Sequence, residues 1–232
     1  FPTRRSSDLD SEGNWRTPFN PRASNHRNDD YCEGTAWQWT WFVPHDVDGL
    51  VELMGGRDAF IGKLDSLFTA DSKLEGESTS VDISGLIGQY AHGNEPSHHI
   101  AHLYNYVGQP WRTQEIVDEV LHTLYFNNPD GLSGNEDCGQ MSAWYILNAM
   151  GFYQVCPGKP VYSIGRPLFN EATVHLKDGK SFKVIAHNNS RDNKYVRSIV
   201  LNGNKLETPF FTHQDIVDGG TLELTMGSEP LK

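Results

Sequence analysis

The chain has 232 residues, enough for one large or two modest domains, and 19 Lys and Arg against 30 Asp and Glu give it a formal net charge of −11. This acidic balance excludes nucleic acid and anionic membrane surfaces as partners, because both require a basic face. Three scattered cysteines exclude a disulfide framework and a C-x-x-C zinc site, and no apolar run is long enough to predict a membrane span.

The first nine residues, FPTRRSSDL, show no periodicity and resemble the translation of a sequencing adapter more than a natural segment. We therefore exclude residues 1–9 from the fold. We expect the chain to be the C-terminal part of a longer protein. Residues 10–30 are polar and contain prolines, which predicts a loop.

Apolar residues at three-to-four-residue spacing then predict a series of helices. An aromatic segment ends at Pro44, and Asp46 is a suitable N-cap for the helix that follows it. Helices are predicted at residues 47–54, 57–68, 97–107, 111–125 and 140–150, with polar loops at 71–80 and 126–139. Their short connections predict antiparallel helical hairpins.

Acidic residues stand at the start of three of these helical segments: Glu33, Glu95 and Asp137. Helices separated by one intervening helix begin at the same end of such an assembly, so Glu95 and Asp137 should share a face, and Glu33 could join them. Amide side chains surround this acidic cleft, from Asn94, Asn135 and Gln140. The alternative for Asp137 is that it only caps its helix, which is worth about 1 kcal/mol.

Two carboxylates that face each other across a sugar are the arrangement that glycosidic bond cleavage requires. One must be protonated to help the leaving oxygen depart, and the other must be ionised to activate water. Carboxylate and amide oxygens also suit a hard cation such as Ca²⁺. No G-x-S-x-G elbow is present, which excludes that type of serine hydrolase.

The histidines of the motif HHIAH offer a different interpretation. His98 and His102 are one helical turn apart, a spacing that zinc sites use, so a zinc hydrolase is an alternative. No third ligand is evident. Histidines that hold a loop by hydrogen bonds, or contact the hydroxyls of a ligand, are the other interpretation.

Beyond residue 156 the pattern changes to alternating β-forming residues. Hairpin turns are predicted at Asp178-Gly179, Asn202-Gly203 and Gly219-Gly220. The predicted fold class is α + β, with helical hairpins over residues 10–156 and an antiparallel, β-sandwich-like segment over residues 157–232.

Three blocks of sequence, in order along the chain, resemble the C-terminal part of glycoside hydrolase family 92: YCEGTAWQWTWFVPHDVDGL, GLIGQYAHGNEPSHHIAHLYNYVGQPWRTQ and DGLSGNEDCGQMSAWYILNAMGFYQV. The resemblance implies a calcium-dependent exo-acting α-mannosidase that inverts the anomeric carbon. It also implies a parent with an N-terminal β-sandwich, missing here, and an (α/α)6 barrel to which these helices contribute.

Carried over by motif, the resemblance implies that Glu33 is the general acid and Asp137 the general base. It implies that Glu95 belongs to the Ca²⁺ site, with Asn94 beside it. Some members have a second aspartate where this chain has Asn135. The predicted sugar-contacting residues are Trp37, His98, His99, Asn135 and Gln140.

The implied partners are a mannose-containing oligosaccharide, such as an N-glycan or mannan, and the missing N-terminal domain. The implied location is the periplasm, the cell surface or the medium of a bacterium. Inversion predicts a separation of about 6.5–9.5 Å between the Glu33 and Asp137 carboxyls, against about 5 Å for retention. We expect the chain alone to be inactive. The competing interpretation is a carbohydrate-binding or adhesion module without catalysis.

Overall fold

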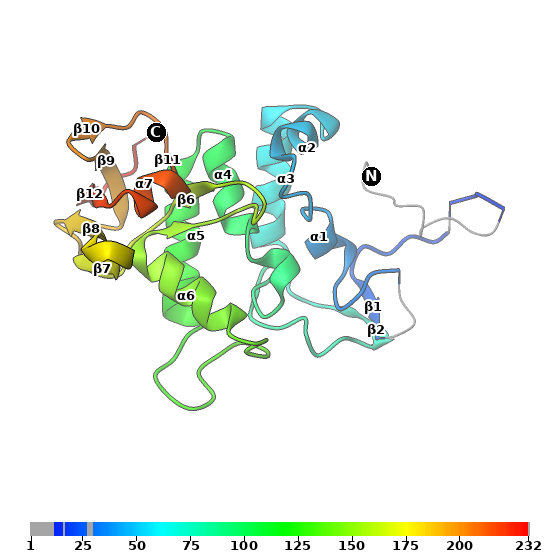
Figure 1. The fold of residues 1–232 in the computed structure, drawn as a ribbon. Helices are drawn as coiled ribbons and strands as arrows, with labels where there is room; N and C mark the ends of the chain where they lie inside the picture. Colours follow the sequence, from blue (N-terminus) through cyan, green and yellow to red (C-terminus); the bar gives the residue numbers. More distant parts are fainter. Residues whose placement is uncertain (1–11, 16, 27–29, 232) are drawn as a thin grey trace. The chain divides into compact units, whose positions relative to one another are not determined.

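The computed structural model describes residues 12–15, 17–26 and 30–231, which form two compact units. The first unit contains the described residues up to His98, together with Leu132–Asn135. The second contains His99–Gly131 and the described residues from Glu136 onward. The chain is α + β, as predicted (Figure 1). Residues 1–9, which we interpreted as adapter-like, lie outside the described residues.

The longer helices of the first unit form where the apolar periodicity predicts them. α2 (Val47–Leu53) begins at Asp46, whose carboxylate accepts a hydrogen bond from the Gly49 amide at 3.0 Å. α3 (Arg57–Thr69) buries a single apolar face made of Phe60, Leu64, Leu67 and Phe68. Trp41 meets Phe60 edge to face, with ring centroids 5.3 Å apart, so the aromatic segment packs on α3.

Three features of the first unit differ from the prediction. β1 (Ala23–Asn25) and β2 (Glu75–Ser78) pair in parallel, although both segments were predicted to be loops. All residues of β2 are exposed, so no apolar alternation marks it in the sequence. α1 (Ala36–Trp39) ends well before Pro44. β3 (Leu86–Ile87) and β4 (Tyr90–Ala91) form a short hairpin that we did not predict.

The predicted helix over residues 97–107 is replaced by shorter turns. The chain forms the 3-10 turns η2 (Glu95–Ser97) and η3 (Ile100–His102) and then the short helix α4 (Leu103–Tyr106). The periodicity still identified the apolar side chains that become buried, Ile100, Leu103, Tyr104 and Val107. A tight 3-10 turn places side chains almost as an α-helix does, so the pattern predicted burial but not geometry.

The two long helices of the second unit, α5 (Pro110–Thr123) and α6 (Gln140–Met150), agree with the prediction. A proline begins α5, where its missing N–H has no intrahelical partner to lose. Gly151 ends α6 in a left-handed conformation, with φ of 104°. No helix in the described ranges is both long and apolar enough to cross a bilayer.

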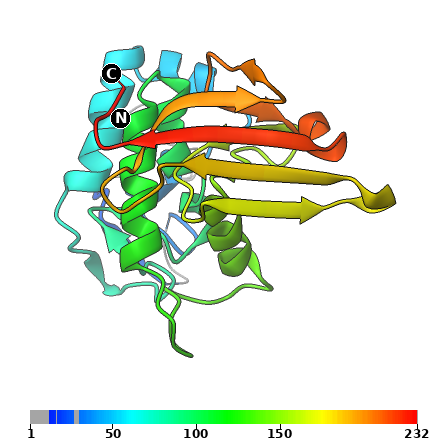
Figure 2. The same ribbon diagram turned by 90° about the vertical axis from the view of Figure 1, so that its left-hand side faces the viewer.

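A five-stranded sheet follows, in the order β10-β9-β12-β8-β7 (Figure 2). Its strands are β7 (Glu171–His175), β8 (Ser181–His187), β9 (Tyr195–Leu201), β10 (Asn204–Lys205) and β12 (Gly220–Gly227). The turns predicted at 178–179 and 202–203 join antiparallel neighbours. The prediction of a hairpin at Gly219-Gly220 is wrong, because α7 (His213–Val217) precedes these glycines and β12 runs parallel to β8.

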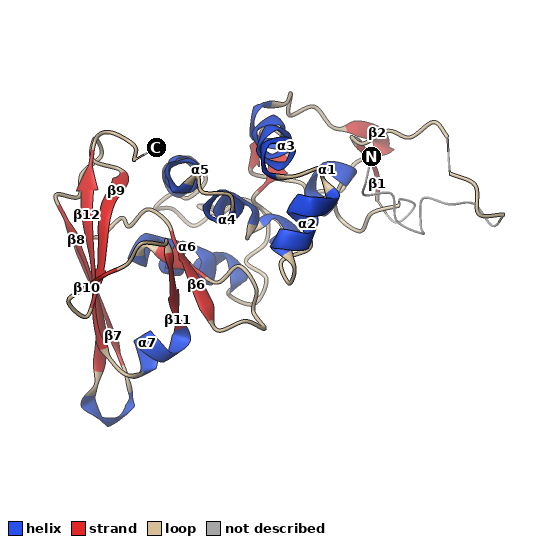
Figure 3. Ribbon diagram, turned by 90° about the horizontal axis from the view of Figure 1, so that it is seen from above, coloured by secondary structure: helices blue, strands red, loops and turns tan. Residues whose placement is uncertain are grey.

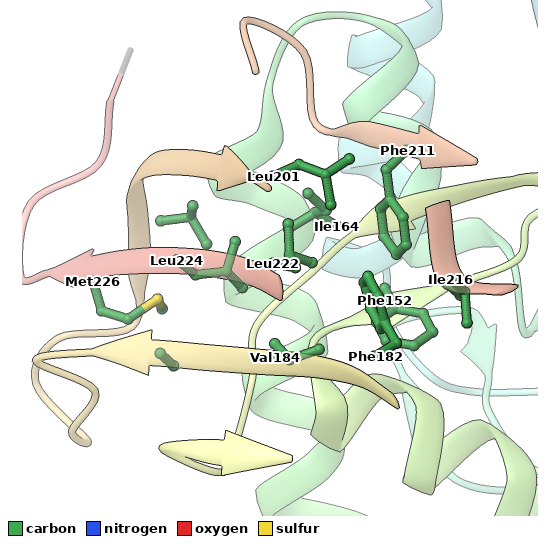
Figure 4. Packing of buried hydrophobic residues seen from close by; sticks show 12 residues of the cluster. Phe152, Ile164, Phe182, Val184, Leu201, Phe211, Ile216, Leu222, Leu224 and Met226 are labelled. Carbon is green, nitrogen blue, oxygen red and sulfur yellow. The ribbon is translucent and has the colours of Figure 1, made fainter. Parts of the chain in front are cut away.

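A smaller sheet in the order β11-β6-β5 packs on one face of the five-stranded sheet (Figure 3). Its strands are β5 (Phe152–Tyr153), β6 (Val161–Ile164) and β11 (Phe210–Thr212). Their side chains share one core with alternate residues of β8 and β12, including Phe152, Ile164, Phe182, Phe211, Leu222 and Leu224 (Figure 4). α5 and α6 belong to the same compact unit as these sheets. The predicted domain division at 156/157 remains a prediction.

Candidate active site

Glu33 lies in a tight turn, and its backbone φ of 51° is left-handed. Residues other than glycine rarely adopt this conformation, so contacts must hold the turn. Trp39 Nε1 donates a hydrogen bond to the Cys32 carbonyl oxygen at 2.9 Å. Asn94 Nδ2 donates to the next carbonyl oxygen, that of Glu33, also at 2.9 Å. Glu33 is exposed, and its carboxylate has no hydrogen-bond partner among the described residues.

The residues after Glu33 explain why the turn forms here. A Cβ on Gly34 would lie 2.6 Å from Trp39 Nε1, so only glycine leaves room for the indole that donates to the turn. Thr35 then starts α1 through a capping box with Gln38, in which the Thr35 amide donates to Gln38 Oε1 at 2.6 Å. A fixed helix start therefore follows the acidic turn directly.

Trp37, a predicted sugar contact, is half-buried in α1. Lys63 Nζ lies 4.5 Å from the centroid of its ring, which is a cation–π contact. Burial lowers the pKa of Lys63. Lys63 therefore occupies one face of the indole, and a sugar could use only the remaining surface of Trp37.

Asn94 and Glu95 stand at the start of η2, close to Glu33. Asn94 is 7% exposed, and its Oδ1 accepts a hydrogen bond from the Glu95 amide at 3.1 Å while its Nδ2 donates to Glu33. Glu95 is half-buried. One buried amide side chain thus joins the backbones of two of the three predicted acidic residues.

His98 and His99, also predicted to contact sugar, are only 2% and 4% exposed. His98 Nε2 forms a hydrogen bond with the His92 carbonyl oxygen at 3.0 Å, and the two rings pack with centroids 5.2 Å apart. Burial, and secondarily the neighbouring His98, lowers the pKa of His92 well below its usual value. His98 holds a loop, as one of our interpretations expected; contact of either residue with sugar stays a prediction.

His102 argues against the alternative of a zinc hydrolase. It is fully buried, and its Nδ1 lies 3.0 Å from Ser163 Oγ and its Nε2 lies 2.8 Å from Asn148 Oδ1. Asn105 Nδ2 donates to the same Ser163 oxygen at 2.6 Å. A neutral ring satisfies this network, with Nε2–H donating to Asn148 and Nδ1 accepting from Ser163. Both ring nitrogens are occupied, so neither is left for zinc.

The buried state of His102 predicts acid sensitivity. Burial lowers its pKa to about 4, a shift that the Asn148 hydrogen bond opposes and the nearby His99 reinforces. The unfolded chain binds a proton near pH 6.5 and the folded chain only near pH 4, so the stability present above pH 6.5 falls as the pH drops to 4. The expected loss is about 3 kcal/mol. Urea unfolding at several pH values should show this slope, and His102→Gln should flatten it. An unchanged slope in the variant would show that His102 does not titrate in this window.

Asp137 also occupies a left-handed turn. φ is 48° at Asp137, 56° at Cys138 and 96° at Gly139. Asp137 is exposed, and its carboxylate has no hydrogen-bond partner in the described part of the chain. Its backbone oxygen accepts from the Gln140 amide at 3.1 Å. The turn therefore presents a free carboxylate just before α6.

Glu136, and not Asp137, caps α6 with its side chain. Glu136 Oε1 accepts from the Ser142 amide at 3.1 Å, and Oε2 accepts from Ser142 Oγ at 3.0 Å. The Glu136 backbone oxygen also accepts from the Met141 amide. The interpretation that Asp137 only caps its helix is therefore wrong, because its neighbour does so.

Asn135, predicted to line the cleft, is exposed, and its Nδ2 lies 3.3 Å from Asp82 Oδ1 within the first unit. Next to it, Gly134 has φ of 83°. A Cβ there would lie 2.7 Å from the Gly93 carbonyl oxygen and 2.9 Å from Ser84 Oγ. The loop before Asp137 is therefore fitted closely to the segment that leads into Asn94.

The predicted metal ligands, Glu95 and Asn94, both carry side-chain oxygens of the kind that calcium prefers. Ca²⁺ takes about six to eight oxygen ligands, and the half-buried carboxylate of Glu95 is a suitable donor. Asn94 Oδ1 accepts the Glu95 amide, and its second lone pair stays available for a cation. No group of three or more His, Cys, Asp or Glu side chains converges as a metal site within the described ranges. A calcium site that includes Glu95 and Asn94 stays a prediction.

The structure thus brings Glu33, Asn94 and Glu95 together in the first unit, and it places Asp137 and Gln140 in the second. That Glu33 and Asp137 share one pocket stays a prediction. The sequence reasoning missed the supporting contacts of Trp39 and Glu136. A signal for the latter is the serine at the third position of the helix that follows Glu136.

Comparison with known proteins gives matches along nearly the whole chain. The family model described as "Glycosyl hydrolase family 92 catalytic domain" matches residues 4–228. A family GH92 alpha-mannosidase from Bacteroides thetaiotaomicron in complex with mannoimidazole is 43% identical, with a TM-score of 0.88 and coverage of 96% of this chain and 30% of that chain. A family GH92 inverting mannosidase from the same species is 43% identical, with a TM-score of 0.81 and coverage of 95% and 30%.

A curated relative, an uncharacterized secreted glycosidase from Arthroderma benhamiae, is 32% identical over 200 residues, which are 85% of this chain and 24% of the relative. The chain therefore spans only 24% to 30% of the length of these proteins. The family model covers nearly the whole chain, and the two acidic turns lie within the matched residues 4–228. This chain therefore belongs to glycosyl hydrolase family 92.

Proposed function

We propose that the protein carrying this chain is an exo-acting α-mannosidase that hydrolyses terminal α-mannosidic bonds of N-glycans or mannans with inversion. The observation that carries the proposal is a matched pair of carboxylates. Glu33 and Asp137 each lie in a left-handed turn fixed by other residues, and each lacks a hydrogen-bond partner among the described residues. The names of the two solved relatives, an alpha-mannosidase and an inverting mannosidase, support the substrate class and the stereochemistry.

In the proposed reaction Glu33 donates its proton to the glycosidic oxygen as the bond to the anomeric carbon breaks. Asp137 takes a proton from a water molecule, which attacks the anomeric carbon from the opposite face. Both groups must change protonation state during the reaction. Carboxylates that are not committed to internal hydrogen bonds, on backbones that are held in place, suit this requirement.

We further propose a longer parent protein, in which these helices complete an (α/α)6 barrel behind an N-terminal β-sandwich. The solved relatives are about three times as long as the matched chain, which supports this arrangement. The chain alone would then lack part of its substrate site and be inactive. The secreted relative supports a location outside the cytoplasm, in the periplasm, at the cell surface or in the medium.

We also propose that Ca²⁺ assists the reaction and that the Glu95 carboxylate is one of its ligands. Bound there, the ion would supply a positive charge for the hydroxyls of the sugar in an otherwise acidic chain. The remaining oxygens would come from backbone carbonyls, water, the sugar or the rest of the parent.

The anomer that is released first tests the proposal. We expect the parent protein to release mannose from the methyl glycoside of an α-linked mannobiose, whose reducing end cannot mutarotate, and proton NMR during the first turnovers should show β-mannose before mutarotation produces the α-anomer. The matching β-linked mannobiose is the control and should not be cleaved. Initial release of α-mannose would contradict inversion. Binding of mannobiose without cleavage would favour a carbohydrate-binding module instead.

A further inference from the structure

We propose that Asn94 is a positioning residue for Glu33; this inference rests on the proposed function. Asn94 is 7% exposed, and both ends of its amide are used. Its Nδ2 donates to the Glu33 carbonyl oxygen at 2.9 Å, and its Oδ1 accepts from the Glu95 amide at 3.1 Å. A carbonyl can only accept and an amide N–H can only donate, so the partners fix which end of the side chain is which.

The contact matters because of the backbone conformation of Glu33. A glutamate with φ of 51° persists only where its surroundings hold it. Two donors hold this turn, Trp39 at the carbonyl before Glu33 and Asn94 at its own carbonyl. Asn94 is 61 positions away in sequence and lies at the start of η2, so it ties the acidic turn to a separate element.

A positioning role accounts for both ends of the Asn94 amide. Its Nδ2 donates to the Glu33 carbonyl oxygen, and its Oδ1 accepts from the Glu95 amide, which begins η2. The same amide group therefore aligns the acid on one side and the neighbouring carboxylate of Glu95 on the other. Loss of the Nδ2 donor alone should misplace Glu33 and leave Glu95 in position.

In the parent protein, the substitution Asn94→Asp removes the Nδ2 donor and changes little else. The aspartate keeps the size of the side chain and an oxygen for the Glu95 amide, but it places an acceptor against the Glu33 carbonyl. Proton donation matters most when the leaving group is a poor one. We therefore expect kcat for α-linked mannobiose to fall about a hundredfold, because small misplacements of a catalytic group have effects of this size. Hydrolysis of a dinitrophenyl α-mannoside, whose leaving group needs little protonation, should change by less than about fivefold.

The Ca²⁺ concentration for half-maximal activity separates the two roles of Asn94. It should stay unchanged in Asn94→Asp, whereas Glu95→Gln should raise it. An Asn94→Asp variant with wild-type kcat on both substrates would overturn the inference, as would one whose only defect is a raised Ca²⁺ requirement. An equal loss on both substrates would also overturn it, since that would reflect a general structural role.

Matched variants complete the test. Asn127→Asp adds the same charge on an exposed loop and should leave both rates unchanged. Trp39→Phe removes the other donor to the turn and should give the same dependence on the leaving group, even if Asn94→Asp fails to fold. Glu33→Gln separates the hypotheses. If it retains wild-type activity on mannobiose, the proposed function fails; if it is inactive while Asn94→Asp is normal, only the role of Asn94 fails.

Discussion

Replacing Asp137 with Asn in the protein that carries this chain should lower kcat for an α-mannoside at least about a thousandfold. The amide has the size of the carboxylate but cannot accept a proton from water. The Asp137 side chain makes no hydrogen bond with the described residues, and Glu136 caps α6. Replacement of Asp137 should therefore leave the start of the helix intact. Steady-state kinetics should show the loss in kcat, with KM nearly unchanged.

The control is Asp130→Asn, an exposed aspartate in the same loop, which should retain wild-type kinetics. Circular dichroism and the midpoint of thermal unfolding should be the same for both variants. A kcat within a few fold of wild type for Asp137→Asn would remove Asp137 from the mechanism.

Replacing Asp118 with Asn should lower the free energy of unfolding by about 3 kcal/mol, because it leaves a buried cation without its counter-ion. Asp118 lies on α5, and its Oδ1 is 2.8 Å from Arg166 Nε, with the two side chains 12% and 3% exposed. His122 Nδ1 lies 3.2 Å from the same oxygen. Arg166 also donates to the Ser190 and Pro167 carbonyl oxygens. The ion pair therefore connects α5 to the loops that contain Pro167 and Ser190.

For a chain of this length, such a loss should lower the midpoint of thermal unfolding by roughly 6 to 12 °C. Glu119→Gln, on the next and exposed position of α5, is the matched control and should change the midpoint little. The double variant Asp118→Leu/Arg166→Met should recover most of the loss, because replacing both ions by apolar groups removes the cost of burying them. A midpoint for Asp118→Asn equal to that of wild type would show that the ion pair contributes nothing to stability.

The elements that the sequence predicted well are those whose signal is local. α2, α3, α5 and α6 each combine an apolar stripe with an end signal, such as Asp46 or Gly151, and short-range periodicity suffices to find them. The parallel pairing of β12 with β8 could not be predicted from the sequence. The Gly219-Gly220 pair indicates a turn, but it does not indicate which strand will pair with β12. β2 was missed because all its residues are polar and exposed.

The candidate site shows the same division. Glu33 and Asp137 could be found from sequence because acidic residues beside glycines and helix starts form a local pattern. The contacts of other predicted residues join distant parts of the chain: Asn94 reaches Glu33 across 61 positions, and His102 reaches Ser163 across another 61. No periodicity encodes such pairs, so neither contact could be predicted, and His102 was considered for zinc.

The central claim is that the two acidic turns face each other across one sugar. The distance between the Glu33 and Asp137 carboxyls in a crystal structure of the parent protein, bound to an unhydrolysed mannoside, measures this directly. We expect about 6.5–9.5 Å, with a water molecule between Asp137 and the anomeric carbon. A separation near 5 Å would indicate retention, and carboxyls that open onto different sides of the molecule would contradict the account.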